Sequence, residues 1–210
     1  MFASALPHDQ RVRDPRWLRA ARWARLLSWA SLAWMTGEGI LGLLAGLDAG
    51  SVSLLGWAVG SVIEGLASVI VIWRFTGART LSETAEALAQ RAVAASLFLL
   101  APYLLVQSVH DLATGHAAKA TVLGIVVTAA SVVVMPALGI AKRRLGASLG
   151  SRATVGEGAQ NLICAAQAAA VLIGLAVTAV YGWTWVDPAV ALLLAAWAVR
   201  EGIEAWQGDS

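Results

Sequence analysis

Two residues in the apolar part of this sequence have side chains that can bind a metal ion, the carboxylate of Glu64 and the thiol of Cys164. Glu64 lies near the middle of an almost wholly apolar stretch from Val52 to Trp73, which is long enough as a helix to cross a bilayer. A charged side chain at the bilayer centre costs roughly 2.5 to 3.5 kcal/mol on insertion scales. An acidic residue at this position therefore indicates a function.

The spacing of the neighbouring residues predicts which way Glu64 faces. Gly56, Gly60, Glu64 and Ser68 recur every four residues, so they lie on one face of the helix. Three of the four are small, which lets another helix approach closely. We therefore expect Glu64 to face protein or a water-filled cavity and not lipid.

Further polar residues fall at a similar depth of the predicted helices. Glu38 is central in the first apolar stretch, and Glu157, Gln160 and Cys164 share one face of the fifth. The helical rise places Glu38, Glu64 and Cys164 roughly 12 to 18 Å from one membrane edge, so they can meet near the midplane. Glu64, Cys164 and Gln160 are the candidate metal ligands, and Glu38 and Glu157 are candidates for a further ligand or a proton relay.

The chemistry of these ligands predicts exchange of metal for protons. Carboxylates and thiolates bind Zn²⁺, and both must lose a proton before they bind it, so metal and protons compete for one site. Structural roles stay open for three of the residues. Cys164 can be a small buried apolar residue, Gln160 can hydrogen-bond between helices, and Glu157 can cap a helix with Thr154 in a T-x-x-E pattern.

Composition defines the class of protein. Of the 210 residues, 59% are hydrophobic and only 13% are charged, and the mean hydropathy is +0.71, which excludes an ordinary soluble domain. A single cysteine excludes an internal disulfide and a cysteine-cluster zinc site. No nucleophile–base pair or metal motif of a membrane hydrolase is present, so we expect neither an enzyme nor a nucleic-acid partner.

The apolar stretches predict an all-α membrane protein with six transmembrane helices in residues 26–206. A basic tail, residues 1–25, precedes them, and no soluble domain is expected after them. A second T-x-x-E pattern, Thr80 to Glu83, predicts the start of the third helix. The predicted spans are Leu26–Leu47, Val52–Trp73, Val93–Ala113, Ala120–Ala141, Thr154–Tyr181 and Pro188–Trp206.

The distribution of charge predicts the orientation. All Lys and Arg residues except Lys119 fall in the tails and the loops on one side of the predicted spans. Cytoplasmic loops carry the excess of basic residues, so both termini are expected in the cytoplasm. The strong preference for Arg over Lys favours a bacterial source and hence the plasma (inner) membrane.

Three segments resemble the cation diffusion facilitator (cation efflux) family. GWTWVDPAVALLLAAWAVREGIEAW from Gly182 is similar to the sixth helix of that family, LLGWAVGSVIEGLASVIVIWR to the second and VGEGAQNLICAAQAAAVLIGL to the fifth. The resemblance implies a six-helix membrane domain, a homodimer, and export of Zn²⁺ or a similar divalent ion in exchange for protons. The family's central ligands correspond to Gly60, Glu64, Gln160 and Cys164, so only Glu64 is a typical hard ligand and the acid expected at position 60 is missing.

Two hypotheses follow. In the first, the chain is a proton-coupled divalent-cation transporter with its site between the second and fifth spans. In the second, it is a non-transporting protein of the same fold that acts as a partner or regulatory subunit. Both hypotheses predict that the second and fifth spans are adjacent, and the first also requires Glu64 to lie close to Cys164.

Overall fold

The computed structural model describes residues 14–49, 52–115, 122–183 and 185–207, and in these ranges it contains six α-helices and one short 3₁₀-helix. The prediction of six helices is therefore confirmed. The helices are α2 (Pro15–Ala49), α3 (Val52–Arg74), α4 (Glu83–Thr114), α5 (Val122–Leu149), α6 (Arg152–Tyr181) and α7 (Val186–Gln207), with η1 (Gly77–Leu81) between α3 and α4.

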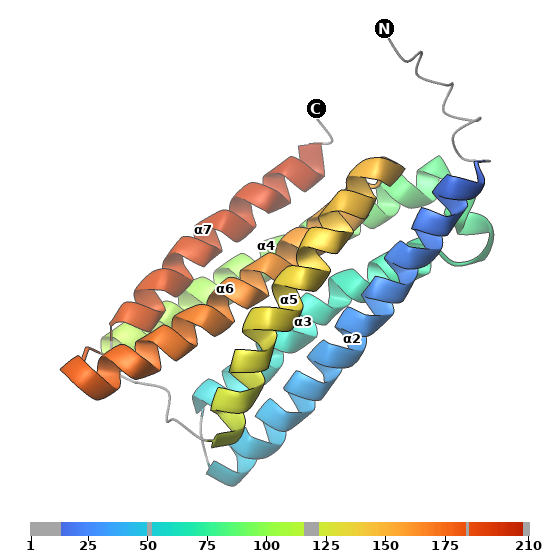
Figure 1. The fold of residues 1–210 in the computed structure, drawn as a ribbon. Coiled ribbons are helices and arrows are strands. Elements are labelled where there is room, and N and C mark those ends of the chain that lie inside the picture. The colour runs from blue at the N-terminus through green and yellow to red at the C-terminus, as the bar shows by residue number, and fades with distance from the viewer. Residues whose placement is uncertain (1–13, 50–51, 116–121, 184, 208–210) are drawn as a thin grey trace, which may run out of the picture.

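The six helices run alternately up and down in one bundle, so α2 begins and α7 ends at the same end of the molecule (Figure 1). We call this end the basal end and the other end the distal end. The closest pairs are α2 with α3, α5 with α6, and α4 with α7, and α6 also packs against α3, α4 and α7. The second and fifth predicted spans, α3 and α6, are thus neighbours as expected.

Helix α2 begins well before the predicted span. It runs without a break from Pro15, so the second half of the expected basic tail belongs to the bundle; residues 1–13 lie outside the described part. The reason is a buried stripe that continues through this segment. Ala21 and Ala24 are buried, and the indole of Trp17 packs against Phe75 and donates a hydrogen bond of 3.3 Å to the carbonyl of Leu149.

At two helix starts the capping residue differs from the threonine of the T-x-x-E pattern. Thr80 lies in η1, and the N-cap of α4 is Ser82, whose backbone is extended and whose hydroxyl accepts a hydrogen bond from the Ala85 amide. Helix α6 likewise begins at Arg152, and the hydroxyl of Ser151 accepts from the Thr154 amide, so Glu157 does not cap this helix. In both cases a serine caps the helix in place of the threonine: Ser82 lies inside the Thr80–Glu83 pattern, and Ser151 precedes the Thr154–Glu157 pattern.

Large apolar side chains lie on the outside of the bundle and small or polar ones lie inside. Val62, Val106 and Val133 are among many exposed apolar residues, whereas the interior is rich in alanine and serine. This distribution suits helices that face lipid and pack on one another through small residues. Among the described residues, two helical segments can cross a membrane by length and composition alone. They are α4, Glu83–Thr114, and the part of α5 from Ile125 to Leu149.

At the basal end, the carboxylate of Glu86 joins three helices. It accepts hydrogen bonds from the Arg74 guanidinium of α3 at 2.7 Å, the Ser151 hydroxyl at 3.0 Å and the Ala153 amide of α6 at 3.2 Å. The Arg74 and Glu86 side chains are mostly shielded, at 6% and 17% exposure. The group therefore holds the start of α6 against α3 and α4.

We predict that Glu86→Ala destabilises the protein by about 2 to 3 kcal/mol, because the substitution leaves Arg74 and the Ala153 amide without their acceptor. Unfolding of the detergent-solubilised protein, followed by tryptophan fluorescence, measures the change. Glu204→Ala is the matched control: Glu204 pairs with Arg200 in an exposed i,i+4 contact, where little effect is expected. Equal effects of the two substitutions would contradict the prediction.

Candidate metal-binding site

Glu64 is buried between helices, as the spacing on α3 predicted. Its side chain is 4% exposed, and Gly60 and Ser68 on the same face are buried too; the surroundings of Gly56 lie outside the described part of the structure. The thiol of Cys164 on α6 donates a hydrogen bond to the Glu64 carboxylate. The expected proximity of these two residues is confirmed.

Glu38 brings a second carboxylate to this place from α2. One of its oxygens accepts hydrogen bonds from the Trp34 indole, at 2.7 Å, and from the Ser131 hydroxyl of α5. Glu38 also interacts electrostatically with Glu64 and with Cys164. Side chains from α2, α3, α5 and α6 therefore converge in the interior.

Gln160 lies one turn from Cys164 on α6, on the basal side. Its side-chain oxygen accepts a hydrogen bond of 3.3 Å from the Ser96 hydroxyl of α4, and its amide nitrogen has no partner. Among the residues that the structure describes, three further buried atoms also lack a partner: Glu38 Oε2, Ser68 Oγ and Asn161 Oδ1. A buried polar atom without a hydrogen bond costs about 1 to 3 kcal/mol, so such atoms mark places that suit water or an ion.

Glu157 has a different partner, which the sequence analysis did not identify. Its carboxylate accepts from the Lys142 ammonium of α5 at 2.6 Å and from the Ser28 hydroxyl of α2 at 2.7 Å. Lys142 also donates to the Ser31 hydroxyl of α2 at 2.5 Å, and both members of the ion pair are 0% exposed. The pair joins α2, α5 and α6 on the basal side of Glu64.

The sequence analysis treated Lys142 only as part of the basic end of a span. The signal that identifies it as an interior residue is its place on α5: Ser131, Met135 and Lys142 follow i, i+4, i+11 spacing, and all three are buried. Close packing of α5 on α6 completes the arrangement. A Cβ at Gly139 would lie 2.9 Å from the Gly158 carbonyl, so only glycine permits this approach.

Among the described residues, no three His, Cys, Asp or Glu side chains are close enough together to hold a metal ion. The interior group instead consists of the Glu64–Cys164 contact, the nearby carboxylate of Glu38 and the amide of Gln160. A metal ion bound by Glu64 and Cys164 would have positions left for the Gln160 oxygen or for water.

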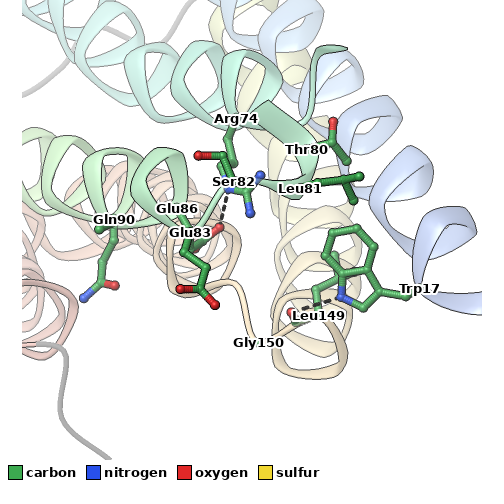
Figure 2. Close-up of a pocket in the computed structure, with 11 residues that line it drawn as sticks. Trp17, Arg74, Thr80, Leu81, Ser82, Glu83, Glu86, Gln90, Leu149 and Gly150 are labelled. Atoms are coloured by element: carbon green, nitrogen blue, oxygen red, sulfur yellow. Dashed lines mark hydrogen bonds and ion pairs between the residues drawn. The ribbon is translucent and has the colours of Figure 1, made fainter. Parts of the chain in front are cut away.

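A cavity of about 280 Å³ lies elsewhere, at the basal end. Figure 2 shows Trp17 and Leu149 on one side of it and Arg74, Glu86 and Gln90 on the other. None of the interior candidates, Glu38, Glu64, Gln160 or Cys164, lines it. It is therefore a separate feature of the bundle.

The arrangement defines a class: a helical membrane protein with an apolar exterior and carboxylates held between its helices. Residues 28–205 match the model of the cation efflux transmembrane domain. The match covers most of the chain, so the protein belongs to the cation efflux family, a family of membrane transporters and not of enzymes. No curated protein matches the sequence.

We predict that Lys142→Met and Glu157→Gln each destabilise the protein by roughly 3 kcal/mol, because each leaves the other polar group buried without its partner. The double variant is expected to be more stable than either single variant, since it removes both charges together. Denaturant unfolding in detergent measures all three. A double variant whose loss equals the sum of the single losses would show that the two residues act independently.

Proposed function

We propose that this chain exports a divalent transition-metal cation, Zn²⁺ or a similar ion, from the cytoplasm across a bacterial plasma membrane in exchange for protons. The observation that carries the proposal is the contact of Glu64 with Cys164 between α3 and α6. Both side chains are buried, and together they offer the oxygen and sulfur ligands that Zn²⁺ accepts.

The surroundings of this contact support passage of an ion. Gln160 and Glu38 each keep a buried atom without a partner, and Ser68 does the same one turn from Glu64. The Glu38 and Ser68 oxygens can coordinate the ion or its remaining waters, and the Gln160 amide nitrogen can donate a hydrogen bond to such a water. In the Lys142–Glu157 ion pair, by contrast, both carboxylate oxygens of Glu157 already accept hydrogen bonds. We therefore assign Glu157 a structural role and do not count it as a metal ligand.

The hydrogen bond between thiol and carboxylate supports coupling to protons. A thiol must lose its proton before its sulfur binds a metal, so metal binding at Cys164 releases at least that proton. When the metal leaves, protons return to the same groups. Glu38, which interacts electrostatically with both residues, is the candidate for receiving a proton on the way.

Orientation and assembly complete the proposal. Both ends of the chain face the cytoplasm, because all Lys and Arg residues but Lys119 lie on the side of the termini. Membership of the cation efflux family favours a homodimer in which each chain carries its own site.

One observation favours the second hypothesis, a partner or regulatory subunit without transport. The described residues hold no group of three acidic, histidine or cysteine side chains of the kind that commonly encloses Zn²⁺. Transport by purified protein separates the two hypotheses.

In proteoliposomes loaded with a fluorescent metal indicator, we expect wild-type protein to move Zn²⁺ or Co²⁺ under a proton gradient. Glu64→Gln is expected to lower this flux at least about ten-fold, because it removes the anionic ligand. Glu204→Gln, at an exposed surface pair, is the control and should leave the flux unchanged. Absence of flux for any divalent ion from folded wild-type protein would support the subunit hypothesis.

Cobalt tests the sulfur ligand directly. Co²⁺ bound by a thiolate shows a sulfur-to-metal charge-transfer absorption that oxygen and nitrogen ligands do not produce. The chain has one cysteine, so any such band reports on Cys164. We expect the band in wild-type protein and its complete loss in Cys164→Ser. A Co²⁺ complex without the band would remove Cys164 from the ligand set.

A further inference from the structure

The place beside Glu64 on the distal side is filled by a residue of another helix. Gly60, one turn before Glu64 on the same face of α3, has no side chain, and Tyr103 of α4 packs against it. A Cβ at Gly60 would lie 3.2 Å from Tyr103 Cε1 and 3.5 Å from the hydroxyl oxygen. The hydroxyl is also hydrogen-bonded to the Gly60 backbone. The tyrosine ring therefore lies directly on the backbone of α3.

Tyr103 connects Glu64 with polar residues farther along α4. Its phenol interacts electrostatically with Glu64 and with Asp111. Tyr103, Gln107 and Asp111 are spaced by four, so they share one face of α4. The Gln107 amide donates to both oxygens of Asp111, at 3.3 and 3.2 Å. A row of polar groups thus runs from Glu64 toward the distal end of α4.

The geometry limits what a metal ion at Glu64 can bind. The ring occupies the space in which a side chain at position 60 would reach the ion, so position 60 of α3 supplies no ligand. A phenol hydroxyl both donates and accepts hydrogen bonds. It can therefore hold the Glu64 carboxylate or a water on the ion in place, which is how residues outside the ligand set tune metal sites.

We propose that Tyr103 is a positioning residue of the Glu64–Cys164 site, and that Tyr103, Gln107 and Asp111 line the route between this site and the distal end of the bundle. The inference rests on the proposed function. It assigns the distal half of the path to one face of α4, and it makes Tyr103 the group that sets how tightly the site holds its ion.

Co²⁺ titration of the full-length protein in detergent tests the position of Tyr103. Tyr103→Phe keeps the ring against Gly60 and removes only the hydroxyl, so we expect Co²⁺ affinity to fall about ten-fold. The thiolate band of Cys164 should persist while the ligand-field bands of Co²⁺ shift. The second tyrosine of the chain supplies the control: Tyr181→Phe changes an exposed residue at the end of α6 and should alter neither quantity.

Gly60→Ala is a second, independent variant, because its Cβ displaces the ring, and it should weaken Co²⁺ binding in the same direction. If Tyr103→Phe binds Co²⁺ as wild-type protein does while Glu64→Gln does not, Tyr103 only packs, and the inference is wrong although the proposed function stands. If wild-type protein binds no Co²⁺ and gives no flux, the proposed function and the inference both fail.

Flux tests the route. Asp111→Asn is expected to slow metal flux in proteoliposomes severalfold while Co²⁺ affinity stays unchanged, because Asp111 lies on the path and not at the site. Glu204→Gln serves again as the control. Normal flux through Asp111→Asn would exclude this face of α4 as the route.

Discussion

The buried pair of Lys142 and Glu157 is the interaction on which the arrangement of the interior depends. Taking an ammonium and a carboxylate out of water is costly, and it is tolerated only when both charges are paired and hydrogen-bonded. Here Ser28 of α2 donates a further hydrogen bond to Glu157, and Ser31 of α2 accepts one from Lys142. The Ser31 hydroxyl also accepts a hydrogen bond of 2.9 Å from the Asn161 amide. Three helices must keep their relative positions for all these bonds to form together.

This constraint reaches the candidate site through the register of α6. Glu157 and Asn161 lie on the same face of α6 as Cys164, so bonds that fix the first two also fix where Cys164 meets α3. The glycine contact between Gly139 and Gly158 holds α5 and α6 at the short distance the ion pair needs. The ion pair near the basal end thus positions the hydrogen bond from Cys164 to Glu64, which lies deeper in the bundle.

The interior therefore contains two polar regions of different character. Around Lys142 and Glu157, almost every polar atom has a partner, which gives rigidity. Around Glu64, polar atoms of Glu38, Ser68 and Gln160 remain unpaired. A transport site needs groups that can exchange partners as an ion arrives and leaves, whereas the helices around it need fixed contacts. In this bundle the fixed contacts of Glu157 and the unpaired amide nitrogen of Gln160 lie on successive turns of α6.

Local sequence determined the helices, their number and the inward direction of Glu64. Hydrophobicity and helical spacing are properties of neighbouring residues, so they can be read without the fold. The similarity to cation efflux proteins, visible in three segments, is likewise a property of sequence, and the family match over residues 28–205 confirms it. The capping residues were less accurate, because Ser82 and Ser151, and not the threonines of the two T-x-x-E patterns, accept hydrogen bonds from the first free amides.

Only the tertiary structure decided the partners between helices. In the sequence, Lys142 is one of three consecutive basic residues at the end of a predicted span. In the structure, it is buried and donates hydrogen bonds to Glu157 and Ser31. Spacing places Tyr103 on one face of α4 with Gln107 and Asp111, but its contact with α3 depends on the missing side chain of Gly60 on that other helix. Such contacts join residues far apart in the chain. Their identity follows from which helix faces pack together, and helical periodicity defines the faces but not their pairing.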